Sequence, residues 1–295
     1  MKTSPPKTRT AFWGAAFLMA TSAIGPGFLT QTTVFTQQLL ASFGFVILLS
    51  ILLDIGVQLN IWRIITGIRK PAQVIADSLL PGMGLLLATL IVLGGLAFNI
   101  GNIAGAGLGL SVITGMDTRL AAGVSAMVGI ALMLSKDAAA TMDNFVKILG
   151  LIMIALTAYV AFVARPGLGE VVYRSFYPAY IDPKAVITIV GGTVGGYICF
   201  AGAHRLLETQ STEPFDQKEV SHAAIKGILT ASAMRLLLFL AAFGVLSKGL
   251  VPDEANPAAG VFRLAAGDTG YRLFGIVMWS AAITSVIGSA FTAVS

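Results

Sequence analysis

Long apolar stretches recur along this chain and restrict it to very few folds. Stretches of roughly 18 or more residues match the length that a helix needs to cross about 30 Å of hydrocarbon. Charged residues make up only 11% of the sequence, against about 25% in a soluble domain. Backbone groups in lipid must be paired within the protein, and helices achieve this locally. The sequence therefore predicts an all-α polytopic membrane protein. The expected spans lie near 11–39, 43–61, 83–113, 118–135, 146–164, 185–204, 227–247 and 272–295.

The basic residues indicate how the chain is oriented in the membrane. Eleven of them fall in the N-terminal tail and in the loops 62–82, 136–147 and 205–226, whereas seven fall on the other side. Cytoplasmic loops of membrane proteins carry the excess of Lys and Arg. We therefore expect an integral protein of the cell (plasma) membrane with a cytoplasmic N-terminus. The N-terminus also has features of a cleaved secretory signal, but its apolar pattern continues past Gly27.

The first expected span contains the stretch "TSAIGPGFLTQTT", from Thr21 to Thr33. Its Gly-Pro-Gly at 25–27 should interrupt the helix and leave backbone groups unpaired, at several kcal/mol each in lipid. Such a break is tolerated only where it is buried in protein or lines a watery cavity. Thr30 and Gln31 follow the break and are too polar for a turn that faces lipid. We predict that the break binds a substrate near the middle of the membrane.

A second glycine-rich segment interrupts a later span, in "IVGGTVGGYICFAGAHRLLE". Broken helices at corresponding positions of two repeats indicate the binding site of a transporter. Numbered from the N-terminus, the two broken helices are helices 1 and 6, and each begins a unit of five. Because five is odd, the second unit must be inverted. The predicted units are 1–165 (helices 1–5, broken at 25–27) and 166–295 (helices 6–8, incomplete, broken near 191–202).

Ionisable side chains inside the expected spans are candidates for function because they are costly in lipid. Asp54 qualifies most clearly, with Gln58 one helical turn later on the same face. It could carry a proton or cation, or it could pair with Arg63 or another cytoplasmic base. Arg235 is expected to extend its charged end to the membrane surface.

The third expected span carries two amides and a regular series of glycines. Asn99 and Asn102 share a helix face and can form hydrogen bonds, but amides transfer no protons at neutral pH. Gly101, Gly105 and Gly109 recur every four residues, a spacing typical of close helix packing in membranes.

No sequence pattern indicates an enzyme or a bound cofactor. There is no phosphate-binding loop, no zinc-ligand spacing and no nucleophile with a paired base, and Cys199 is the single cysteine. His204 and His222 make no convincing metal site on their own, and the dispersed basic residues do not favour nucleic acid. The predicted partners are the lipid bilayer and a small ion or solute, moved with or without protons.

The order of these features resembles the Nramp family of transporters, which are proton-coupled divalent-metal symporters with a LeuT-like inverted-repeat fold. The resemblance spans nearly the whole chain. It implies ten or eleven helices, so we expect this chain, with about eight spans, to be a fragment or a shortened form of such a protein. Residues 25–28 correspond to the family's helix 1 break, Asp-Pro-Gly-Asn, and residues 99–105 correspond to its helix 3 pattern, Asp-x-x-Glu-x-x-Gly. Asp143 corresponds to the acidic residue at the start of helix 5. Residues 191–197 correspond to the helix 6 motif, Gly-Ala-Thr-Val-Met-Pro-His.

The chain departs from the family at the residues that carry its chemistry. The family's metal-binding Asp, Asn and Met are replaced by Gly25, Phe28 and Gly195, and its helix 3 acids by Asn99 and Asn102. What remains is carbonyls, hydroxyls and amides, which suit harder ions or none. The metal ligands are therefore unknown, and three functions stay open: cation transport, transport of a small organic solute such as an amino-acid-like carboxylate, or a non-transporting sensor or partner subunit.

The candidate residues fall into two groups. Asp54 is the candidate for proton coupling. The candidate substrate-binding residues are Gly25, Pro26, Gly27, Phe28, Thr30, Gln31, Asn99, Asn102, Gly195, Gly196 and Tyr197.

Overall fold

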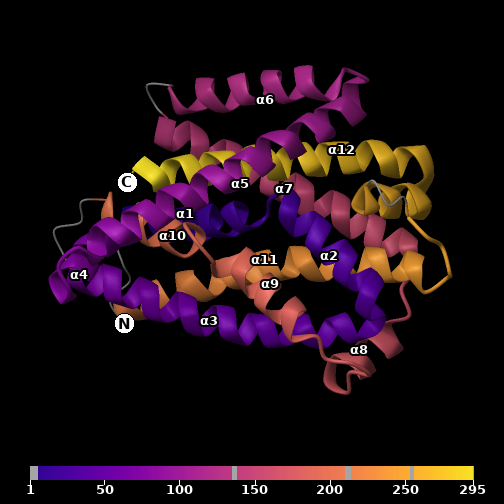
Figure 1. The fold of residues 1–295 in the computed structure, drawn as a ribbon, viewed down its shortest axis with the longest axis horizontal. Helices are drawn as coiled ribbons and strands as arrows, with labels where there is room; N and C mark the ends of the chain where they lie inside the picture. The colour runs from indigo at the N-terminus through magenta and orange to yellow at the C-terminus, as the bar shows by residue number, and fades with distance from the viewer. Residues whose placement is uncertain (1–5, 135–137, 210–213, 253–255, 295) are drawn as a thin grey trace.

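The computed structural model describes the backbone of residues 6–134, 138–209, 214–252 and 256–294, with the side chains of 6–10, 133, 138–147, 291 and 294 left out. Helices make up the described chain, which contains no strand (Figure 1). The elements are α1 (Pro6–Ala23), α2 (Pro26–Leu39), η1 (Leu40–Ser42), α3 (Phe43–Ile68), α4 (Ala72–Leu79), α5 (Met83–Thr114), α6 (Thr118–Met133), α7 (Ala138–Ala164), α8 (Leu168–Phe176), α9 (Pro183–Val194), α10 (Ile198–Leu207), α11 (Gln217–Leu246) and α12 (Pro257–Val294).

The first membrane helix is broken between α1 and α2, as predicted, although the break begins one residue earlier. Ile24 and Gly25 are non-helical, whereas Pro26 already occupies the first turn of α2. Proline has no N–H, so it cannot donate to the carbonyl of Ser22 four residues earlier. Its fixed φ also suits the first position of a new helix. Pro26 therefore ends α1 and begins α2.

The second predicted break is present but shorter than the sequence suggested. Only Gly195, Gly196 and Tyr197 are non-helical, between α9 and α10. Gly196 has φ +56°, a left-handed conformation that glycine adopts without steric cost. The neighbouring glycines lie within helices, and Gly202 on α10 is packed against Trp62. The glycine run thus serves the break at one end and helix packing at the other.

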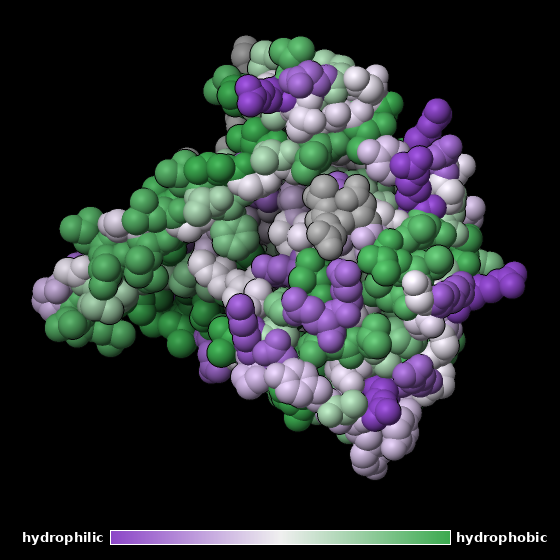
Figure 2. Space-filling view, turned by 45° about the vertical axis from the view of Figure 1, so that its right-hand side comes forward, coloured by the Kyte–Doolittle hydropathy of each residue, from purple (hydrophilic) through white to green (hydrophobic). Residues whose placement is uncertain are grey.

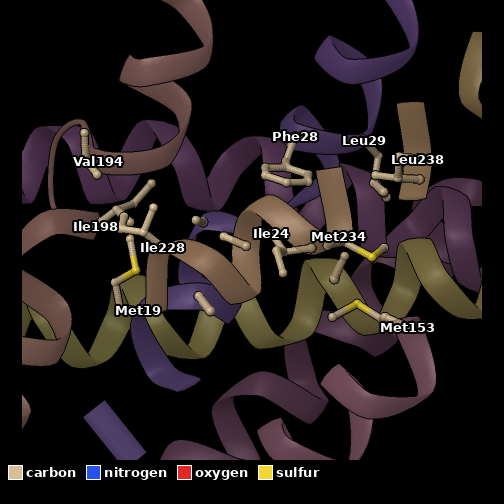
Figure 3. Close-up of a cluster of buried hydrophobic side chains, with 14 of the residues drawn as sticks. Met19, Ile24, Phe28, Leu29, Met153, Val194, Ile198, Ile228, Met234 and Leu238 are labelled. Carbon is tan, nitrogen blue, oxygen red and sulfur yellow. The ribbon is translucent and has the colours of Figure 1, made fainter. Parts of the chain in front are cut away.

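The halves of the two broken helices pack crosswise. α1 lies against α10, and α2 lies against α9. Figure 3 shows Ile24 and Phe28 from the first break in one buried apolar cluster with Val194 and Ile198 from the second. Both breaks therefore share the central core. The division of the chain into inverted repeats at 165/166 stays a prediction.

The lengths of the helices agree with a membrane protein. Five helical stretches of the described chain are long and apolar enough to cross a membrane, and a sixth candidate is bent by 107° between Ile148–Ala164 and Leu168–Phe176. The predicted spans each coincide with a helix or a broken pair, and α12 carries non-helical angles at Ala266 and Gly267. The described chain begins and ends at the same end of the molecule (Figure 1), which agrees with the even number of spans that the sequence predicts.

Much of the surface is apolar, as expected of a surface that faces lipid. α5 exposes Leu85 (75%) and Ile100 (66%), and α6 exposes Leu120 (65%). Figure 2 shows one lobe covered almost entirely by hydrophobic side chains, with hydrophilic side chains gathered elsewhere on this face. Hydrophobic areas of this extent are unusual on soluble monomers.

The glycine series on α5 only partly forms the predicted packing face. Gly105 lies against the ring of Pro26, and Gly109 lies against the backbone of Trp279. Gly101 instead has nothing within 4 Å of the position where a Cβ would stand. Gly105 and Gly109 therefore permit close helix contact, whereas Gly101 does not, because it lies on the exposed side of α5.

Candidate functional site

A hydrogen-bonded network surrounds the carbonyl that Pro26 leaves without a helical partner. The Ser22 carbonyl accepts hydrogen bonds from Ser285 Oγ at 3.0 Å and from the Tyr197 hydroxyl at 3.3 Å. Asn102 Nδ2 donates to Ser285 Oγ at 2.9 Å. All of these side chains are buried. Since Tyr197 belongs to the second break, the network joins the two breaks through α5 and α12.

Gly25 leaves no room for a side chain at the centre of this network. A Cβ at this position would stand 2.9 Å from Asn102 Oδ1 and 3.1 Å from Ser285 Oγ. Separations this short are rarely seen for real Cβ atoms. Gly25 therefore allows α5 and α12 to approach the broken backbone.

The sequence did not single out the contribution of α12. Ser285 and Ser289 lie one turn apart, and Ser289 Oγ donates to Asn99 Oδ1 while Ser285 bonds to Asn102. The two serines of α12, four residues apart, thus pair with the two asparagines of α5, three residues apart. The signal was present in "SAAITSVIGSAFT", where small hydroxyl residues recur along one helix face, but nothing in the sequence indicates which helix they meet.

Other predicted site residues on α2 lie outside the network. Thr30 is exposed and its hydroxyl donates to the Pro26 carbonyl of its own helix, at 3.1 Å. Gly27 is exposed, with open space where a Cβ would stand, and the same space exists at Gly196. The Gln31 side chain instead reaches α9, where its Oε1 would be 2.8 Å from a Cβ at Gly192.

Phe28, Asp54 and Arg235 belong to a second buried polar group. The guanidinium carbon of Arg235 lies 3.9 Å from the ring centroid of Phe28, and Arg235 Nη2 donates to Thr193 Oγ1 at 3.0 Å. Asp54, which is 1% exposed, interacts electrostatically with Arg235 and with the Thr193 hydroxyl. We call Phe28, Asp54, Thr193 and Arg235 the charged group.

The charged group corrects two expectations. Arg235 is 2% exposed and does not extend to the membrane surface. The reason is that α11 begins at Gln217, before its apolar stretch, which places Arg235 deep within the helix. Arg63, the other proposed partner of Asp54, instead donates to Ser221 Oγ at 2.9 Å.

Gln58 lies one turn from Asp54 on the buried face of α3. It is fully buried, and neither amide atom has a hydrogen-bond partner among the described residues. Trp62, a further turn along, donates to the Cys199 carbonyl of α10 at 3.0 Å. Because Asp54 is opposite Thr193 and Trp62 is opposite Cys199, Gln58 faces the second break between them.

The described residues contain no group of three or more His, Cys, Asp or Glu that could hold a metal ion. His204 lies in the last turn of α10 beside the ring of Phe200. The side chain of Asp143, which the family resemblance assigned to helix 5, falls outside the described side chains, as do Lys136 and Lys147 of the charge count.

Comparison with known proteins identifies relatives of high similarity. The chain is 57% identical over 282 residues to YcsG of Bacillus subtilis (strain 168), described as an uncharacterized membrane protein, and covers 70% of it. It is 56% identical over 287 residues to an uncharacterized membrane protein of Haemophilus influenzae, and covers 72% of that protein. In the two comparisons, 96% and 97% of this chain is matched.

Solved structures with the same fold come from a manganese transporter of Eremococcus coleocola. A complex of that protein with an aromatic bis-isothiourea compound matches 99% of this chain, with a TM-score of 0.75 and 18% identity. A mutant of the same transporter matches with a TM-score of 0.73. This chain spans 66% of the transporter's length, just under two thirds. The match confirms the predicted fold class, a helical LeuT-like transporter fold.

The family comparison covers almost the entire chain. The family described as natural resistance-associated macrophage protein-like, or Nramp, matches residues 16–294. That range includes both helix breaks and the residues that α5 and α12 place around them. The chain belongs to the Nramp family.

Proposed function

We propose that this chain forms the core of a secondary membrane transporter, in which a small ion or solute binds between the two helix breaks. The observation that carries the proposal is the network in which Tyr197 of one break and Ser285 of α12 bond to the freed Ser22 carbonyl of the other. Broken helices free backbone groups for substrates, and movement of one unit against the other exposes the site to each side in turn. The crosswise packing of α1 with α10 and α2 with α9 suits such movement.

A divalent metal ion is the first candidate substrate, supported by membership of the Nramp family and by the fold shared with a manganese transporter. The oxygen atoms available at the first break are the Ser22 carbonyl, the Asn102 amide and the hydroxyls of Tyr197 and Ser285. Neutral oxygen ligands favour hard ions such as Mg²⁺ or Mn²⁺ over softer ones.

Coupling to protons belongs to the same proposal and is assigned to Asp54. The helix 3 residues that are acidic elsewhere in the family are amides here, and they bond to serines of α12. Asp54 is a buried carboxylate next to the second break, and the guanidinium of Arg235 on α11 interacts with it electrostatically.

A small organic carboxylate is the second candidate substrate. The first turn of α2 presents the backbone N–H groups of Gly27 and Phe28, and no side chain caps them. Helix N-termini of this kind favour negative charge. No carboxylate of the described residues takes part in the network at the first break, and Arg235 offsets the charge of Asp54, the carboxylate of the charged group.

Uptake into proteoliposomes tests the proposed function. We expect the purified chain to accumulate either Mn²⁺ or a small carboxylate when an inward proton gradient is imposed. Liposomes with the Asn102→Leu variant should accumulate neither, because that change removes the hydrogen bond to Ser285. Absence of uptake of every substrate by the folded chain would instead favour the non-transporting sensor or partner subunit.

A further inference from the structure

We infer that Arg235 anchors the carboxylate of a small organic substrate between the two helix breaks. The inference rests on the proposed transport function and names the chemical class of its substrate. It departs from the metal cargo that family membership suggests, because it assigns the site to an anion.

Arg235 is placed between the two breaks by its contacts. Its guanidinium stacks on Phe28, in the first turn of α2, at 3.9 Å from the ring centroid. Its Nη2 donates to Thr193, in the last turn of α9, at 3.0 Å. One buried side chain thus contacts the helix that begins after the first break and the helix that ends at the second.

The contacts of Arg235 within the protein leave one of its nitrogens unused. Asp54 balances its charge, Thr193 accepts from Nη2 and Phe28 covers its face. Nη1 is buried and has no hydrogen-bond partner among the described residues. A buried donor of a charged group is costly to leave unpaired. A ligand oxygen at Nη1 would remove that cost.

The surroundings of Nη1 favour an anion over a metal ion. The guanidinium is planar and matches the geometry of a carboxylate. The first turn of α2, which Arg235 contacts through Phe28, adds the uncapped N–H groups of Gly27 and Phe28 and the positive end of the helix dipole. A divalent cation at the same place would be repelled by both.

Acceptors on α3 add a preference for substrates that also carry an N–H group. Asp54 Oδ1 and Gln58 Oε1 are buried without a hydrogen-bond partner among the described residues. Both lie on the face of α3 that is turned toward α9 and the second break. An amino acid could place its carboxylate on Arg235 and its ammonium group on these acceptors. We expect L-alanine to bind more tightly than L-lactate, from which it differs in that group.

Thermal unfolding of the detergent-purified chain provides the test, with L-alanine, L-lactate, lactamide and MnCl₂ as probes. A ligand that binds only the folded state raises the unfolding temperature in proportion to RT ln(1 + [L]/Kd). We expect a concentration-dependent shift with alanine and lactate, and none with lactamide, which lacks the negative charge. Arg235→Lys should weaken carboxylate binding by roughly 10- to 100-fold, since lysine has a single donor nitrogen and lacks the planar fork that offers Nη2 to Thr193 and Nη1 to a ligand.

The controls separate this inference from the proposed function. Arg63→Lys changes an exposed arginine on α3, outside the charged group, and the variant should bind ligands like the parent. If Arg235→Lys fails to fold, the charge-neutral pair Asp54→Asn with Arg235→Gln replaces it, with the same expectation. Two results would overturn the role of Arg235 while leaving the proposed transport function intact. In the first, only MnCl₂ raises the unfolding temperature of the parent. In the second, alanine and lactate still raise the unfolding temperature of both Arg235→Lys and the paired variant. Uptake of neither class would remove the proposed function itself.

Discussion

At the scale of single residues, the missing N–H of Pro26 brings together the atoms at the first break. The Ser22 carbonyl has no helical donor, so it accepts from Ser285 and Tyr197, and these hydroxyls come from segments far away in the sequence. Gly25 keeps the space open for them. Each of these residues has a role only in the presence of the others.

Ser285→Ala should destabilise the protein by about 1–3 kcal/mol, the cost of leaving buried groups unpaired. The change removes one of the two donors to the Ser22 carbonyl, which keeps Tyr197, and it leaves Asn102 Nδ2 without its acceptor. Denaturant or thermal unfolding in detergent measures the loss. Ser78→Ala is the matched control, because the exposed Ser78 hydroxyl donates to the carbonyl of Ile75 in its own helix. Equal effects of the two substitutions would contradict a special role for Ser285.

Asp54→Asn should remove the pH dependence of uptake. If Asp54 carries a proton with the substrate, acid on the uptake side stimulates the parent and has no effect on the variant. Uptake measured across a series of external pH values decides between the two. Asp268→Asn serves as the control, since Asp268 is exposed and pairs with Arg263 at 3.5 Å. A variant with the parent's pH profile would clear Asp54 of this role.

At the scale of helices, close approach depends on where glycines face. α5 lies along α12 and also contacts α2, and Gly105 is the point at which the Pro26 ring meets α5. Gly101 is one turn earlier on the same helix but points into open space. Gly105 is therefore needed for close helix packing, whereas Gly101, four residues earlier, makes no such contact.

Gly105→Ala should destabilise the fold and impair uptake, because the new methyl group would overlap the Pro26 ring. Overpacking of this kind costs about 1–3 kcal/mol. Gly101→Ala should be neutral or stabilising by up to about 1 kcal/mol, as alanine favours a helix. The unfolding temperatures of the two variants, measured side by side, test the contrast. A loss of stability in both would mean that the helix tolerates no added methyl group.

At the scale of the whole molecule, the arrangement of helices fixes which loops share a side. The loop around α4 and both chain ends lie at one end of Figure 1, and α8 lies at the other. The excess of basic residues at the first end predicts that this end faces the cytoplasm. On that prediction, α8 lies at the opposite side of the membrane.

Labelling of single cysteines tests this orientation. In a Cys199→Ser background, Lys248→Cys should react with a membrane-impermeant maleimide added to intact cells. Ser78→Cys should react only after the membrane is opened, because it lies at the opposite end. Reaction of Ser78→Cys in intact cells, with protection of Lys248→Cys, would reverse the predicted orientation.

The sequence indicated the helices and their breaks because these depend on local chemistry. Apolar length, Pro26 and the glycines at 191–196 are properties of short segments, and the structure places both breaks within a residue or two of them. The family resemblance could also be seen, since the motif positions keep their order along the chain. The inverted repeat and the site assignments stay predictions.

The partners of polar side chains were decided by tertiary structure alone. The pairing of Asn102 with Ser285 spans 183 residues of sequence, and a hydrogen bond over that distance has no local signal. The sequence predicted Arg235 near the start of its helix and therefore at the membrane surface. The structure shows that α11 begins earlier, at Gln217, so Arg235 lies deep within the helix. The sequence by itself determined which segments are helical and where they break, since those follow from backbone hydrogen bonding in lipid. Only the packing of α3, α9 and α11 decided that the charges of Asp54 and Arg235 interact beside the second break.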